Sequence, residues 1–101
     1  MESARRTVAV AGELRDLIPR FLANRRLEVA QLGAAAARGD FEAARRIGHT
    51  LKGVGGGYGF DEITRLGAAI ESSARNGGGE VAALARELAD YLDRVEITFT
   101  P

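Results

Sequence analysis

Helical periodicity interrupted by glycines is the feature of this sequence that most constrains its fold. Apolar residues recur every three to four positions from about residue 18 to residue 95, which is the spacing of one face of an α-helix. Glycines interrupt this pattern at Gly39, at residues 55–57 and at residues 77–79, where helices can end. Alanine is abundant and only 2 prolines occur, which favours helix. Four amphipathic segments with short connections predict an all-α, up-down-up-down antiparallel four-helix bundle.

The chain length sets the expected domain organisation. A chain of 101 residues can bury one core and is too short to bury two. We expect the bundle at residues 13–96, with a short N-terminal extension at residues 1–12 and a C-terminal tail at residues 97–101. The apolar stripes are wide enough for one bundle to bury its own core, so we expect a monomer.

Capping residues indicate where the helices begin and end. Asp16, Asp40 and Asp61 are candidate N-caps of the first three helices, because an aspartate oxygen can accept from a free amide of the first turn. Pro19 fits the first turn of the first helix, where its missing amide is not needed. The second helix is expected to end at the glycine cluster at residues 55–57.

Charge and residue usage argue against several classes of protein. The 14 basic and 14 acidic side chains cancel, whereas a duplex-binding domain of this size normally carries a basic excess. The chain has no cysteine, which removes disulfides and thiolate metal sites and suits the reducing cytoplasm. No apolar run is long enough for a membrane span. We therefore expect no nucleic-acid partner, no membrane segment and a cytoplasmic location.

His49, the only histidine, is expected on the solvent face of the second helix. At about 100° per residue, Ala44, Leu51 and Val54 fall on the opposite side, which is the core face. One histidine without cysteine is a poor metal site, so no metal is expected. The glycine-rich stretch that follows lacks Gly-Lys-Ser/Thr and comes after a helix, which argues against a phosphate-binding loop. Within roughly 60° of His49 on the same face lie Glu42, Arg45, Arg46, Lys52, Gly53 and Gly56.

An exposed imidazole in this setting can act as a nucleophile. Histidine forms covalent intermediates near neutral pH, and phosphoryl transfer requires little beyond positioning and charge stabilisation. Lys52 lies one turn after His49, so its flexible stem can bring the ammonium to a phosphoryl oxygen. Gly53 costs about 1 kcal/mol relative to alanine inside a helix, and we interpret it as a bare spot that another protein can approach. Gly48 lies toward a flank of the helix, where close packing is the better explanation.

The residues around His49 also resemble a known family. The sequence HTLKG at residues 49–53, followed by Gly59 and a helix that contains Glu71, is similar to the histidine-containing phosphotransfer (HPt) domain over about residues 16–95. The resemblance implies a phosphorelay intermediate of two-component signalling, supplied by a histidine kinase or by the aspartyl phosphate of a response-regulator receiver domain. It implies no cofactor, nucleotide site or autokinase activity, and any Mg²⁺ is expected only in the partner receiver domain.

The resemblance further implies roles for individual residues. The phosphoryl group is expected on Nε2 of His49, with Lys52 assisting it and Gly53 leaving room for the receiver domain. Glu71 is expected to hold the Nδ1–H of the imidazole, and Arg75 to support the site or the partner contact. The patch expected to bind the partner comprises Arg45, Arg46, Gly53 and Gly56.

Two alternative functions stay open from the sequence. The bundle could be a helical adaptor that binds a receiver domain without phosphotransfer, or the phosphoacceptor module of a larger sensor kinase. The charge balance of the site also stays open, because a carboxylate at Glu71 favours protonation of His49 whereas Lys52 and the nearby arginines oppose it.

Overall fold

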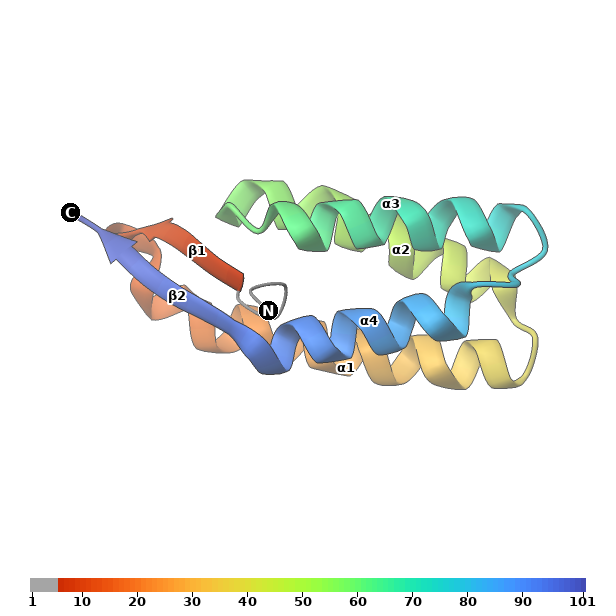
Figure 1. The fold of residues 1–101 in the computed structure, drawn as a ribbon. Coiled ribbons are helices and arrows are strands. Elements are labelled where there is room, and N and C mark those ends of the chain that lie inside the picture. The colour runs from red at the N-terminus through yellow and green to blue at the C-terminus, as the bar shows by residue number, and fades with distance from the viewer. Residues whose placement is uncertain (1–5) are drawn as a thin grey trace.

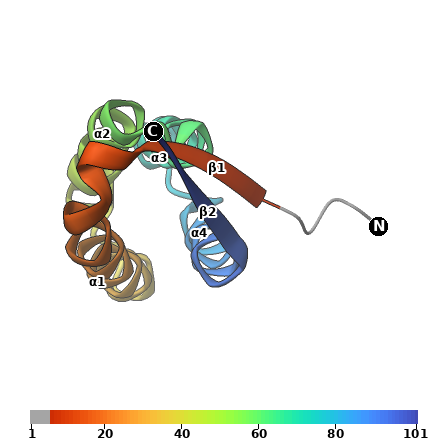
Figure 2. The same cartoon turned by 90° about the vertical axis from the view of Figure 1, so that its left-hand side faces the viewer.

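The computed structural model describes residues 6–101, which form four helices with a small sheet at one end (Figure 1). The four-helix bundle predicted from the sequence is thereby confirmed. Viewed along the bundle axis, the helices follow one another around a ring, and the last also packs beside the first (Figure 2). The elements in chain order are β1 (Arg6–Ala11), the 3₁₀ turn η2 (Gly12–Leu17), α1 (Ile18–Ala37), α2 (Phe41–Tyr58), α3 (Asp61–Arg75), α4 (Val81–Arg94) and β2 (Val95–Thr100).

The core runs along the axis of the bundle and receives side chains from every helix. Leu32, Leu51, Leu66 and Leu88, one from each helix, are fully buried. Burial of one such side chain stabilises the fold by about 1.5–3 kcal/mol relative to exposure. The apolar stripes predicted from the sequence are therefore the faces that the helices turn inward.

Helices α2 and α3 approach each other closely because glycines lie between them. A Cβ atom on Gly48 would lie 2.7 Å from the amide nitrogen of Glu71, and one on Gly67 would lie 2.8 Å from the carbonyl oxygen of Gly48. Neither position has room for a methyl group, so a side chain there would push the helices apart. The interpretation of Gly48 as a packing residue is confirmed, and the close approach places Glu71 beside α2.

One of the three predicted N-caps is present in the structure. Asp40 caps α2, since its Oδ1 accepts from the amide of Ala43 at 3.1 Å. The prediction for Asp16 is wrong, because this residue lies inside η2 and α1 begins only at Ile18. The amide of Ile18 donates to the carbonyl of Arg15 in η2, and Pro19 has no amide hydrogen to satisfy, so two of the first amide positions of α1 need no side-chain cap. Pro19 occupies the first turn of α1, as predicted.

The prediction that Asp61 caps the third helix is also wrong. Asp61 is already the first residue of α3, and the residue before it, Phe60, takes the N-cap position without a side-chain hydrogen bond. Phe60 is fully buried. Its burial sets the path of the chain into α3, so the aspartate is shifted one residue into the helix.

Helix α2 does not end at the glycine cluster, in contrast to the prediction. It continues through residues 55–57 to Tyr58 and ends where Gly59 takes a left-handed φ of 89°. Tertiary contacts hold the last turns: the first glycine of the cluster is buried against Thr64, and the ring of Tyr58 packs on Phe21 with centroids 4.3 Å apart. These contacts outweigh the cost of glycine in a helix, which is about 1 kcal/mol for each residue.

Parts of the expected extension and tail form a sheet, which the sequence analysis did not predict. Strands β1 and β2 pair in parallel, with Val8 opposite Ile97 and Val10 opposite Phe99. Burial alternates along β2, so one face packs on the bundle and the other is exposed. A two-stranded sheet is marginal by itself, and packing against the helices stabilises it. The tail is therefore a strand for most of its length, whereas residues 1–5 of the extension lie outside the described residues.

Candidate functional site

His49 lies near the middle of α2 and points to solvent, as the sequence predicts. Its side chain is 67% exposed. Ala44 and Leu51, on the opposite side of the same helix, are fully buried. The imidazole is therefore presented on the surface of a helix whose other face is anchored in the core.

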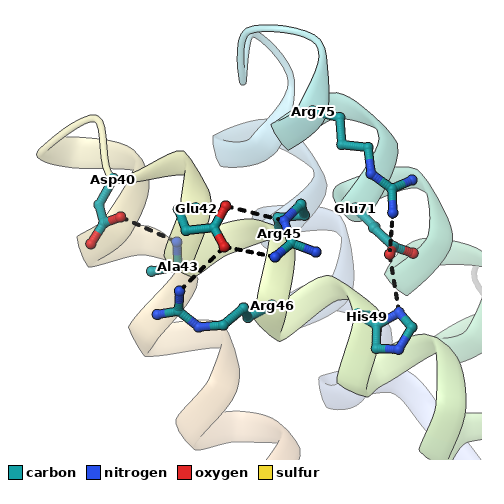
Figure 3. A network of polar contacts seen from close by, with 8 residues as sticks. All are labelled: Asp40, Glu42, Ala43, Arg45, Arg46, His49, Glu71 and Arg75. Atoms are coloured by element: carbon teal, nitrogen blue, oxygen red, sulfur yellow. Dashed lines mark hydrogen bonds and ion pairs between the residues drawn. The ribbon is translucent and has the colours of Figure 1, made fainter.

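Glu71 of α3 holds the imidazole in one orientation. Its side chain is only 4% exposed, and its Oε2 lies 3.0 Å from Nδ1 of His49 (Figure 3). An ionised carboxylate can only accept a hydrogen bond, so Nδ1–H is the donor. In the neutral ring the proton therefore resides on Nδ1, and Nε2 keeps a free lone pair.

Two cations also bind the carboxylate of Glu71. Lys52 of α2 places its Nζ 2.9 Å from Oε1, and Arg75 of α3 places Nη2 3.0 Å from Oε2. The hydrogen bond from Lys52 is the main cause that lowers the pKa of Glu71; burial opposes this effect, while His49 and the charge of Arg75 add to it. Glu71 is consequently a carboxylate at neutral pH although it is buried.

Arg45 and Arg46 lie on the same side of α2 as His49, but both bind Glu42 instead. Nη2 of Arg45 lies 2.6 Å from Oε2 of Glu42, and Nη1 of Arg46 lies 3.6 Å from the same oxygen (Figure 3). The Arg45 hydrogen bond lowers the pKa of Glu42, and the same contact raises the pKa of Arg45. The structure thus brings Lys52 and Arg75 to the carboxylate that holds His49, and directs Arg45 and Arg46 to a separate ion pair one to two turns earlier.

Gly53 and Gly56 leave the surface beside His49 bare. Beyond the neighbouring backbone of α2, a Cβ atom on Gly53 would meet no atom within 4 Å, and one on Gly56 would meet only the Thr64 hydroxyl at 3.7 Å. Both residues are exposed. Packing within the bundle therefore does not require glycine at these two positions, in contrast to Gly48.

Gly67 is the residue of the site that the sequence analysis missed. It allows α3 to approach α2 within contact distance of Gly48, one turn before Glu71. The available signal was a glycine inside a strongly periodic helical segment, which usually has a packing reason. The close approach that this glycine allows brings α3, and with it Glu71, against the helix that carries His49.

Two further findings concern the described residues, 6–101. They contain no group of three histidine, cysteine, aspartate or glutamate side chains placed to hold a metal ion. Among these residues there is also no helix with the length and hydropathy needed to cross a bilayer.

A four-helix bundle with one exposed histidine held by a buried carboxylate has the architecture of a phosphocarrier module. The family model described as Hpt domain matches residues 16–98, which is most of the chain, and the protein belongs to this family. Hpt domains transfer phosphoryl groups in two-component signalling and interact with histidine kinases and receiver domains. Neither the curated proteins nor the solved structures gave a significant match.

Proposed function

We propose that this protein carries a phosphoryl group on Nε2 of His49, between a histidine kinase or receiver domain and a second receiver domain. The contact between Nδ1 of His49 and the buried Glu71 carboxylate is the observation that carries this proposal. It keeps the proton on Nδ1 and leaves the lone pair of Nε2 for the phosphorus atom. The remaining chemistry follows from this orientation.

The transfer step can be written with the residues of the site. The Nε2 lone pair of His49 attacks the phosphorus of an aspartyl phosphate, forming an N–P bond as the bond from phosphorus to the carboxylate oxygen breaks. The released aspartate keeps the electron pair. The ring retains its Nδ1 proton and gains positive charge, which Glu71 stabilises across the 3.0 Å contact. Transfer to the second receiver reverses these changes.

In this proposal the ammonium of Lys52 stabilises the negative charge of the phosphoryl group. Its side chain is 42% exposed, and it lies three residues after His49 on one helix face. The ammonium is a compact charge on a flexible stem, so it can turn from Glu71 to a phosphoryl oxygen without movement of the backbone.

The receiver domain would dock over the bare surface at Gly53 and Gly56. The absence of side chains there allows a partner backbone to approach the histidine, and Arg45 and Arg46 border the same face. The protein itself contributes no nucleotide site in this proposal, and any Mg²⁺ required belongs to the acidic pocket of the receiver.

A transfer assay tests the proposal. A receiver domain is first phosphorylated with ³²P-acetyl phosphate and is then mixed with the wild-type protein or with His49→Gln. The acid-labile, base-stable ³²P label on each of these two proteins is measured. We expect label on the wild type and none on His49→Gln. Absence of label on the wild type across a panel of receivers, with binding retained, would instead show a helical adaptor without phosphotransfer.

A further inference from the structure

Glu71 accepts from more side chains than a carrier histidine requires. Its Oε2 is shared by Nδ1 of His49 and Nη2 of Arg75, each at 3.0 Å, while its Oε1 accepts from Nζ of Lys52 at 2.9 Å. Three positive or hydrogen-donating groups therefore meet on one carboxylate that is only 4% exposed. The imidazole is positioned by one of these contacts, so the two cations need a separate explanation.

The contact of Lys52 conflicts with its proposed role. To bind a phosphoryl oxygen on His49, the ammonium must turn away from Oε1 of Glu71. A buried carboxylate that loses its counter-ion is strongly destabilised. If Lys52 were the only cation on Glu71, its departure would be opposed by the carboxylate that orients the histidine.

Arg75 resolves this conflict through its position on the helix. It lies four residues after Glu71 on α3, an arrangement that favours an ion pair within one helix and does not depend on α2. Its guanidinium is always charged and presents several donors in a fixed plane. Its contact is to Oε2, the oxygen that also holds the imidazole, whereas Lys52 uses Oε1.

We propose that Arg75 is a positioning residue, the permanent counter-ion of Glu71, and that it frees Lys52 to leave this carboxylate for the phosphoryl group. This inference rests on the proposed function of His49 and concerns how the charges of the same site are arranged during transfer. Arg75 acts through Glu71 and does not touch the phosphoryl group.

The other charged groups near the site do not supply this counter-ion. On α2, Arg45 and Arg46 bind Glu42 at 2.6 and 3.6 Å, and the charge of Glu71 has only a minor influence on the pKa of Arg45. In the described part of α1 and α4, no side chain forms an ion pair with Glu71 or Lys52. Arg75 is thus the cation that remains on Glu71 when Lys52 turns away.

A double-mutant cycle on phosphotransfer tests the inference. The rate of phosphoryl transfer from a phosphorylated receiver domain is measured for the wild type, for Arg75→Gln, for Lys52→Gln and for the double variant. We expect Arg75→Gln to slow transfer about fivefold in the wild-type background, the size typical of coupled groups in one network. In the Lys52→Gln background we expect it to change the rate less than about twofold, since there is no lysine left to release. Equal effects in both backgrounds would overturn the inference.

Titration of the His49 ring by NMR provides a second readout that needs no phosphotransfer. Loss of Arg75 removes a positive charge from Glu71, so the ring signals of Arg75→Gln should titrate at higher pH than those of the wild type. Arg75→Lys should stay close to the wild type because the charge is kept. Arg65→Gln is the matched control, since Arg65 is an exposed arginine of α3 that pairs with Glu62 and Glu87 away from the histidine.

The two measurements separate the inference from the proposed function. If the wild type takes no label from any receiver, the phosphocarrier proposal fails, and the ring titration still tests whether Arg75 acts on Glu71. If the wild type is labelled but the His49 ring signals of Arg75→Gln titrate at the same pH as those of the wild type, the carrier function stands and the role of Arg75 is overturned.

Discussion

Glu71 combines burial with three hydrogen-bonding partners, so its charge affects both stability and chemistry. Its neighbours hold its pKa below the ordinary value, with the hydrogen bond from Lys52 as the main cause. A carboxyl whose pKa is lowered by folding stabilises the protein above the pKa of the unfolded state. This contribution is lost as the pH falls through the lowered pKa of the folded state.

Glu71→Gln should remove this pH dependence. The free energy of unfolding, measured by urea denaturation at about pH 7 and about pH 3, should fall less on acidification in Glu71→Gln than in the wild type. Glu80→Gln is the control, because Glu80 is exposed and forms no side-chain ion pair in the described part of the chain. An equal fall in wild type and Glu71→Gln would show that this carboxylate does not contribute to acid sensitivity.

We expect Gly53 to affect the docking of the receiver domain and not the folding of the bundle. We expect Gly53→Gln to keep the fold, because open space surrounds this position, and to lower kcat/KM for transfer from a receiver about tenfold through weaker docking. The matched control is Gly33→Gln, since Gly33 of α1 is equally exposed and equally free of neighbours. An unchanged kcat/KM in Gly53→Gln would contradict the steric role of this glycine.

At the level of helices, the glycine contact between α2 and α3 decides whether the site forms. Gly48 and Gly67 let the two backbones meet, and at this separation Oε2 of Glu71 lies 3.0 Å from Nδ1 of His49. The same contact explains why a short bundle without disulfides holds its surface histidine in a defined orientation.

Gly67→Ala should destabilise the protein although alanine is the better helix former. Its methyl group would clash with the backbone of α2, and such overpacking costs about 1–3 kcal/mol. Gly53→Ala, where the methyl group points into open space, should instead raise the free energy of unfolding by about 1 kcal/mol. Urea denaturation measures the free energy of unfolding of both variants. If Gly67→Ala is no less stable than Gly53→Ala, α2 and α3 can separate at no cost and the packing role of Gly67 is wrong.

At the level of the whole molecule, the two chain ends close one end of the bundle. β1 and β2 belong to opposite ends of the sequence, and their apolar residues join or pack against the same hydrophobic core. The sheet thereby ties the start of α1 to the end of α4. It lies at one end of the bundle (Figure 1).

Ile97→Ala should measure what this sheet contributes. Ile97 is half-buried and faces the helices, so we expect a loss of about 1–3 kcal/mol, less than for a fully buried isoleucine. Thr98→Ala, on the exposed face of the same strand, should change the free energy of unfolding by less than about 0.5 kcal/mol. Equal effects of the two changes would mean that the sheet does not pack on the bundle in solution.

Local spacing was sufficient to predict the features that depend on one helix alone. The 3.6-residue period identified four helices, and the position of His49 on α2 followed from the same period, because both depend on neighbours within a few residues. The Asp40 cap was predicted for the same reason. The end of α2 was not predicted, because contacts with Phe21 of α1 and Thr64 of α3 carry the helix past its glycines.

The sequence by itself therefore determined that His49 would be exposed on a helix of a four-helix bundle. Only the tertiary structure decided what surrounds it. The pairing of the two end strands, and the contacts of His49 and Lys52 of α2 with the carboxylate of Glu71 on α3, depend on distances between elements. Those distances are set by packing, and at the histidine site two glycines between α2 and α3 allow the close approach. No spacing along the chain encodes them.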